Sequence, residues 1–458
     1  MNSGATSAPS LQRDAADLAN DEHFLRAVSG LAASQVVVAD SAIYSSSGVK
    51  LLEKGARVDS RLYAQLIQHR LAGALDDQLT TSNPVDVTCL EAQVLLLSGA
   101  NPLGRLLVRS LGQRQHLLLE ALRHMKWAQH ASFKMTVMRH HLPQLFEHSI
   151  LMMMVSVSLA IKQGMAARDC ADLAVAALLH DVGMLYMPVS WQNPRHKLTH
   201  DEQRQLAAHT ITGMLVVRAA KAYSREVEDA VLEHHERLDG SGYPRLLKAE
   251  EISPWGRILM LAEVVSAFYG KYQDMPAQRL SLMLRMNHSR FDTALMQHVF
   301  AMLAQDAALQ TQQSMPSGEA VREVVGALGG LFQHWQQCKR QLPEGWQSMP
   351  GARACMYVEL RLQSLQKSLA ESGSHPRQQV DWQQLFEEDP SSTHELMLIY
   401  SEALWQVEHC VEACLRRWPN LLHAIAPVDR ALAEWLKASR KVFAQKHMAA
   451  QSVATLGN

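Results

Sequence analysis

Apolar residues recur every three to four positions along most of the chain between about residues 100 and 310. Stretches such as DLAVAALLH and EVEDAVLEHH carry this spacing, and the longer LPQLFEHSILMMMVSVSLAI does so over 20 residues. A repeat at i, i+3 and i+4 places the apolar side chains on one face of an α-helix. The pattern predicts a bundle of amphipathic helices over residues 101–310.

The chain before this bundle has a different pattern. We expect residues 1–32 to form a flexible N-terminus. Between about residues 33 and 59, short β-branched runs are broken by Ser-Ser-Ser-Gly and Lys-Gly, which is typical of short strands joined by turns. A helical stretch over residues 61–71 follows. Residues 33–100 are therefore predicted to form a small mixed α/β unit.

Further helices are predicted after residue 310. Breaks rich in Gly, Pro and Ser separate them, such as MPSGEA and EEDPSS. Residues 311–458 therefore form a predicted helical C-terminal extension. Within it, residues 429–447 are basic and amphipathic, and could bind a protein partner or a membrane surface. Packing against neighbouring helices is the favoured interpretation. The predicted fold class is mostly α.

Composition narrows the functional classes. The chain has 458 residues and a formal net charge of −1, which gives no support to a nucleic-acid polymer as partner. Its six cysteines show no CxxC spacing, which is typical of reduced thiols. The first 20 residues lack the apolar core of a signal peptide. The most apolar run, Ile150–Ile161, is too short to span a bilayer. We expect a cytoplasmic protein with no transmembrane segment.

Histidines and carboxylates gather at several predicted helix ends. His234, His235 and Glu236 stand together before a Gly- and Pro-rich loop, and such groups are costly to bury unless something satisfies them. His180 and Asp181 are adjacent at the end of an apolar helix, which we expect to stop at Gly183. They indicate a site at the ends of the predicted helices.

Two further histidines lie on helices. His209 follows the helix start predicted from the capping box Thr199–Glu202, and His148 lies on the apolar helix of the bundle. Either one alone is more often a core residue than a ligand. Together with the residues above, they match the imidazole and carboxylate ligands of Fe, Mn, Co or Zn. Asp181 is the natural bridge between two ions, since its two oxygens can each bind one.

The segments HDVGMLYMP, HTITG and HHERLDGSGYP, in this order, resemble the HD-GYP family of the HD phosphohydrolase superfamily. The resemblance covers roughly residues 140–295. It implies an all-α bundle that holds two or three metal ions and hydrolyses cyclic di-GMP, a bacterial second messenger used in signal transduction. The expected cofactors are two divalent ions, Fe, Mn or similar.

The resemblance also implies roles for particular residues. The expected metal ligands are His148, His180, Asp181, His209, His234, His235 and Glu263. Glu263 lies in ILMLAEVVSAF, where the family has an aspartate. Asp181 and Tyr243 are expected to act in catalysis, and the expected substrate-binding residues are Met184, Asp239, Gly240, Gly242 and Tyr243. Tyr243 could shape the pocket, or could pack under the loop.

Three positions depart from the family pattern. Met184 stands where the family has a lysine, Gln144 where members with three metals have a glutamate, and YGKYQDM where Arg-Pro-Tyr is usual. The loss of lysine removes a cation from the expected phosphate site, although Met184 could also be a gap-filling core residue. We therefore expect a slow phosphodiesterase that stops mainly at the linear dinucleotide. The alternative is a degenerate, non-catalytic relative that regulates by binding a nucleotide or a protein.

Overall fold

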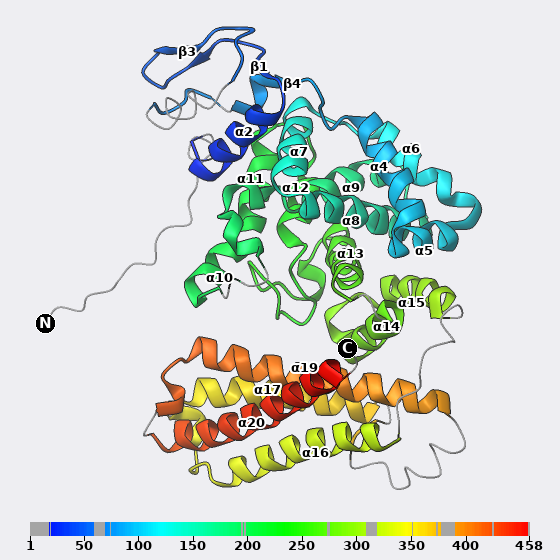
Figure 1. The fold of residues 1–458 in the computed structure, drawn as a ribbon, viewed down its shortest axis with the longest axis vertical. Helices are drawn as coiled ribbons and strands as arrows, with labels where there is room; N and C mark the ends of the chain where they lie inside the picture. Colours follow the sequence, from blue (N-terminus) through cyan, green and yellow to red (C-terminus); the bar gives the residue numbers. More distant parts are fainter. Residues whose placement is uncertain are drawn as a thin grey trace, which may run out of the picture. The chain divides into compact units, whose positions relative to one another are not determined.

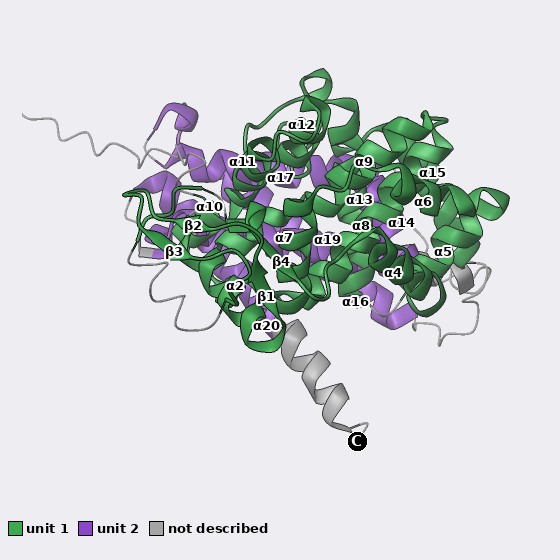
Figure 2. Cartoon of the chain, turned by 90° about the horizontal axis from the view of Figure 1, so that it is seen from above, with its two compact units in different colours: residues 1–276, 289–306 green, residues 277–288, 307–458 purple. Residues whose placement is uncertain are grey.

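The computed structural model describes residues 18, 20–58, 69–73, 75–193, 196, 198–272, 275–307, 318–349, 351–371, 374–376, 390–423 and 426–456. The chain divides into two compact units (Figure 2). The first comprises residues 1–276 and 289–306, and the second comprises residues 277–288 and 307–458. Most described residues are helical, which confirms the predicted fold class.

The first unit begins with a helix and short strands (Figure 1). These elements are α2 (Glu22–Ser34), β1 (Val37–Ala39), β2 (Ile43–Tyr44), β3 (Lys50–Leu52), η1 (Leu75–Asp77) and β4 (Leu79–Thr81). The strands form two antiparallel pairs, β1 with β4 and β2 with β3. The predicted helix over residues 61–71 lies mostly outside the described residues.

The prediction of a flexible N-terminus over residues 1–32 is wrong from residue 22 onward. The Asp21 carboxylate accepts hydrogen bonds from the backbone N–H groups of His23 and Phe24, which caps the start of α2. Helix α2 then buries Phe24 and Leu31 among other apolar residues. An N-cap and a buried apolar face are enough to order this part of the chain.

The helical part of the first unit surrounds α8 (Pro143–Lys162), against which α9 (Ala167–Leu179), α13 (Pro254–Lys271) and α7 (Gln129–His141) pack. Its other long elements are α4 (Val87–Ala100), α5 (Pro102–Leu111), α6 (His116–His124), α10 (His200–Ala207), α11 (His209–Ala219), α12 (Arg225–Glu233) and α15 (Thr293–Ala307). Its short 3₁₀ turns are η2 (Gly112–Gln115), η3 (Val182–Tyr186), η4 (Val189–Gln192), η5 (Ala249–Glu251) and η6 (His288–Arg290), the last of which begins in the second unit. Helix α4, which falls inside the range predicted for the N-terminal unit, packs against α5 and α6.

Helix α8 is long and apolar enough to cross a membrane, and within the described residues no other helix is. However, 78% of its apolar window is buried inside the structure. The neighbouring helices α7, α9 and α13 cover it. A helix that is apolar all round is as typical of the centre of a soluble bundle as of a membrane span. Helix α8 is therefore a core helix of the first unit.

The second unit is built from long helices: α14 (Pro276–Met286), α16 (Gly318–Arg340), α17 (Ala352–Glu371), α19 (Pro390–Arg417) and α20 (Pro427–Leu456), with the short turns η7 (Trp346–Ser348) and η8 (Leu421–His423). Trp335 and Trp435 meet edge to face in its core, with ring centroids 5.1 Å apart. Helix α20 therefore packs its apolar face inside this unit. The four-segment division at residues 32, 100 and 310 stays a prediction.

Candidate metal centre

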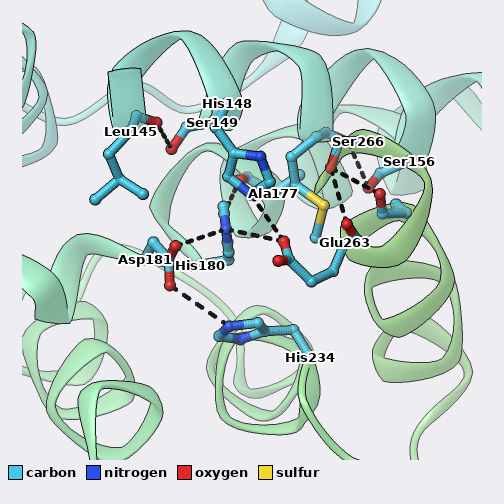
Figure 3. A network of polar contacts seen from close by, with 12 residues as sticks. Leu145, His148, Ser149, Ser156, Ala177, His180, Asp181, His234, Glu263 and Ser266 are labelled. Carbon is cyan, nitrogen blue, oxygen red and sulfur yellow. Dashed lines mark hydrogen bonds and ion pairs between the residues drawn. The ribbon is translucent and has the colours of Figure 1, made fainter. Parts of the chain in front are cut away.

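Ligand-type side chains from five parts of the first unit converge. His148 lies on α8 and Glu263 on α13. His180 and Asp181 occupy the turn between α9 and η3, so α9 ends at Leu179 and not at Gly183 as predicted. Figure 3 shows His180 between Asp181 and Glu263. The remaining ligand-type residues are His209, the first residue of α11, and His234 and His235, which follow α12.

Gly183 has a packing role in place of the predicted one. A side chain there would collide with the carbonyl oxygen of His209. The turn η3 therefore lies directly against the start of α11. This close packing brings His209 to the side of Asp181, although 28 positions separate them in the sequence.

The first group of ligand-type residues is His148, His180 and Glu263. His148 Nε2 lies 2.8 Å from Glu263 Oε2, and His180 Nε2 lies 3.5 Å from the same oxygen. The second group is Asp181, His209, His234 and His235. In each group the ligand-type atoms lie within 4.8 Å of one another, so each group could hold a metal ion.

Asp181 faces both groups. Its Oδ2 lies 3.3 Å from His180 Nε2, in the first group. Its Oδ1 lies 3.1 Å from His209 Nε2 and 3.6 Å from His234 Nε2, in the second. The two oxygens of one carboxylate thus point toward different groups, and the role of Asp181 as a bridge between two ions stays a prediction.

Three histidine rings are oriented by the backbone. The Nδ1 atoms of His180, His209 and His234 lie 2.8, 2.6 and 2.7 Å from the carbonyl oxygen three residues earlier. In the neutral imidazole, donation from Nδ1–H to a carbonyl leaves Nε2 unprotonated and aimed away from the helix, ready to accept a cation. Such second contacts fix the tautomer and the ring angle of metal ligands.

The burial of polar atoms tests whether a metal ion fits. Among the described residues, His180 Nε2 and Asp181 Oδ1 are buried and have no well-aligned hydrogen-bond partner, although other ligand-type atoms lie near them. A buried polar atom without a partner costs free energy. A bound cation would satisfy both atoms, and imidazole with carboxylate suits a borderline divalent ion. The residues present therefore fit a metal.

Burial and neighbouring charges shift the pKa values of the ligand-type residues. Burial lowers the pKa of His235 well below its usual range, and the neighbouring His234 and His209 lower it further. Burial would raise the pKa of Asp181, but the adjacent histidines hold it well below its usual value. Burial opposes protonation of His148, yet Glu263 raises its pKa to about 9. In the metal-free protein Asp181 is ionised, His235 is neutral, and His148 carries a proton that a cation would displace.

Glu236 is a residue whose role the sequence interpretation missed. It is fully buried, and its carboxylate accepts hydrogen bonds from the N–H groups of Arg245 (2.7 Å) and Leu247 (3.0 Å). Leu246 between them has a φ of 59°, a left-handed conformation that L-residues rarely adopt. The backbone there wraps around the carboxylate in the manner of an anion-binding nest. Glu236 thus holds the loop in place. In the sequence, the position of this carboxylate between His235 and a Gly-rich turn was the available sign of that role.

Tyr243 packs against a ligand-type histidine. Its ring stacks on His235 with centroids 4.7 Å apart, and its N–H donates to the His235 carbonyl at 3.1 Å. Burial, and then the charges of Asp181 and Glu263, raise the pKa of its phenol, so that the phenol stays protonated at neutral pH. The phenol of Tyr243 is therefore a neutral hydrogen-bond donor on a ring that packs against His235.

The other predicted substrate-binding residues are engaged by the loop itself or by the core. A side chain at Gly242 would collide with the backbone of Glu236, so this glycine is needed for packing within the loop. Gly240 has a φ of 74°, and Asp239 pairs with Arg290 at 3.3 Å. Met184 is buried in η3, with 9% of its surface exposed. The roles of these residues in binding stay predictions.

Comparison with known proteins shows what the part of the chain around this centre is similar to. The family model described as an HD domain matches residues 134–295. A cyclic di-GMP phosphodiesterase of Pseudomonas aeruginosa is 31% identical over 122 residues, which cover 27% of this chain and 30% of that protein. The cyclic di-GMP phosphodiesterase PdeB of Borreliella burgdorferi is 30% identical over 120 residues, which cover 26% and 31%.

A third relative has a different substrate in its name. The 3′3′-cGAMP-specific phosphodiesterase 2 of Vibrio cholerae is 33% identical over 119 residues, which cover 25% of this chain and 23% of that protein. Residues 134–295 thus match the HD-domain family, and the resemblance to HD-GYP proteins is confirmed. The chain spans about a third or less of the length of these relatives.

Proposed function

We propose that this chain is a metal-dependent phosphodiesterase that hydrolyses cyclic di-GMP. The observation that carries the proposal is the shared carboxylate of Asp181, which faces two groups of ligand-type residues. Relatives named as cyclic di-GMP phosphodiesterases support the choice of substrate. A cytoplasmic location and a role in bacterial signalling remain part of the same proposal.

In this proposal the two groups hold two divalent ions, Fe, Mn or similar. His148, His180 and Glu263 would hold one ion; His209, His234 and His235 would hold the other; Asp181 would contact both. When bound, two such ions neutralise the charge of a phosphodiester and lower the pKa of a water molecule to near neutrality.

The chain's own residues contribute orientation and a hydrogen bond. The carbonyl contacts at Nδ1 keep the histidine rings in place before any ion binds, so little reorganisation is needed. The neutral phenol of Tyr243 would donate to a substrate oxygen. Met184 supplies no charge where the family has lysine. We therefore expect slow turnover that accumulates the linear dinucleotide.

The test is metal analysis followed by turnover. Purified wild-type protein should retain metal and, with added Mn²⁺ or Fe²⁺, should convert cyclic di-GMP to the linear dinucleotide, as followed by chromatography. The Vibrio relative makes 3′3′-cGAMP the matched second substrate. Faster turnover of 3′3′-cGAMP than of cyclic di-GMP would contradict the proposed substrate. Rapid conversion of cyclic di-GMP to GMP would contradict the proposed product, the linear dinucleotide.

The second candidate is a non-catalytic relative that regulates by binding a nucleotide or a protein, and Met184 favours it. The loss of a cation weakens stabilisation of the transition state more directly than it weakens binding of a nucleotide. Calorimetry with cyclic di-GMP separates the two candidates. Tight binding by metal-loaded protein without turnover would support the regulator and reject the enzyme.

A further inference from the structure

A lysine lies buried outside the metal centre. Lys134, on α7, has 3% of its surface exposed. Its Nζ lies 2.8 Å from Asp76 Oδ2 and donates to the Tyr186 hydroxyl at 2.9 Å. Asp76 belongs to η1 and Tyr186 to η3. A buried charge is tolerated only when it is paired and hydrogen-bonded, so this arrangement fixes three elements at one atom.

Aromatic rings complete the surroundings of Lys134. Its Nζ lies 4.3 Å from the ring centroid of Phe24, on α2. The Phe24 ring in turn stacks on Tyr186, with centroids 5.1 Å apart and an interplanar angle of 17°. Cation–π contacts stabilise a desolvated ammonium further. Residues from α2 and η1, near the start of the chain, are thereby held against η3.

The turn η3 carries the metal centre at its other end. Asp181 is its N-cap residue, and the Asp181 carbonyl accepts the N–H of Met184 at 2.9 Å. Gly183 lies directly against the carbonyl of His209. A displacement of η3 at Tyr186 would therefore disturb the 3.1 Å contact between Asp181 and His209.

We propose that Lys134 is a positioning residue for the metal centre. It joins the N-terminal elements α2 and η1 to η3, and through η3 it sets the places of Asp181 and His209. The N-terminal elements would then act as a structural brace of the site, so that any event which loosens them weakens metal binding. Any effect of Lys134 on turnover rests on the proposed function. The two measurements that test the inference, Mn²⁺ affinity and hydrogen exchange, do not depend on turnover.

The main test is the double variant Lys134→Met/Asp76→Leu in the full chain. It removes both charges together, because the removal of one alone would leave an unpaired buried ion. The matched control is Gln129→Ala. Gln129 also joins α7 to the N-terminal elements, through a 2.8 Å hydrogen bond to Asp40, but that contact is exposed and does not involve η3.

Two measurements decide the proposal. Chelator competition should show that the double variant binds Mn²⁺ roughly tenfold more weakly. This factor is the lower end of the loss that is usual when a group supporting the metal ligands is removed. Hydrogen exchange at saturating Mn²⁺ should be faster in residues 180–187 of the double variant and unchanged in the control. Equal Mn²⁺ affinity and equal exchange in wild type, control and double variant would overturn the proposal.

A milder variant covers the case in which the double variant does not fold. Tyr186→Phe removes the hydroxyl that accepts from Lys134 and keeps the ring that stacks on Phe24. It should shift Mn²⁺ affinity and exchange in the same direction by a smaller factor, and no shift would reject the proposal. If wild type turns over no cyclic dinucleotide while these shifts appear, the proposed function fails and the brace stands.

Discussion

The two units of this protein both bury side chains of types that can bind metals, but among the described residues only those of the first unit are arranged as a site. In the second unit, Cys338, Cys355, Cys410 and Cys414 are all buried. Burial raises the pKa of each thiol to about 12, so these thiols are neutral at pH 7. Within the described residues, the groups that could hold a metal ion lie in the first unit.

The difference lies in where the side chains stand on their helices. The cysteines stand within the long helices α16, α17 and α19, which bury them in an apolar core. By contrast, His180, His209 and His234 lie at helix ends, where a backbone carbonyl turns each ring toward a common point. Burial of ligand-type residues is not enough, because orientation and opposite charge decide whether they converge.

The largest expected effect is that of Asp181→Ala. Because Asp181 faces both groups, its loss should remove metal from both, and with it nearly all phosphodiesterase turnover. Elemental analysis of the purified variant is the measurement. The control is His116→Ala, since His116 has the same Nδ1 contact to a carbonyl three residues earlier, at 2.9 Å, but is exposed on α6. Equal metal loss from both variants, or full metal content in Asp181→Ala, would contradict the shared-carboxylate model.

The next largest effect is an expected increase in turnover when the lysine of the family pattern is restored. Met184→Lys should raise turnover by roughly tenfold, the lower end expected when a single preorganised charge is restored, with metal content unchanged. Met184 is buried in η3, three residues after Asp181, and the prediction takes its side chain to point toward the metal centre, where a lysine stem could pack while its charge faces the substrate. Met184→Leu is the control and should leave the rate as it is. A metal-loaded lysine variant that turns over no faster would show that the missing cation does not limit the rate.

A smaller effect is expected from Glu236→Gln, which tests whether the loop depends on the buried carboxylate. The substitution keeps one oxygen for two backbone donors, so it should lower the free energy of unfolding by roughly 1–3 kcal/mol and raise KM. Urea denaturation and steady-state kinetics measure the two effects. Glu250→Gln is the control, because Glu250 is exposed in the same region. Unchanged stability in the Glu236 variant would mean that the loop keeps its conformation without the Glu236 carboxylate.

The smallest effect on the metal is expected from Cys414→Ala, which sharpens the comparison of the two units. Cys414 is fully buried in the core of the second unit, so its loss should lower the free energy of unfolding by about 1 kcal/mol. Metal content, measured beside the Asp181 variant, should equal that of wild type. Metal loss from Cys414→Ala would show that the second unit contributes to the metal centre.

The sequence by itself determined the helical fold and the candidate ligands. Periodic apolar spacing is a local property, and it predicted the bundle because helices form wherever one face can be buried. The motif residues around His180 and His234 carried the family resemblance, and the match to the HD domain confirmed it. Local patterns also misled, since residues 22–32 form part of α2 and α9 ends at Leu179.

Only the tertiary structure decided which distant residues meet. His148 and Glu263 are 115 positions apart and touch at 2.8 Å, and no local pattern contains that distance. The same holds for Lys134 with Asp76 and Tyr186, and for Gly183 against His209. Such contacts depend on how whole helices pack, because ridges and grooves far from the motif set the approach of each backbone. The sequence therefore determines the chemical groups, and packing determines which of their atoms lie close enough to bind one ion.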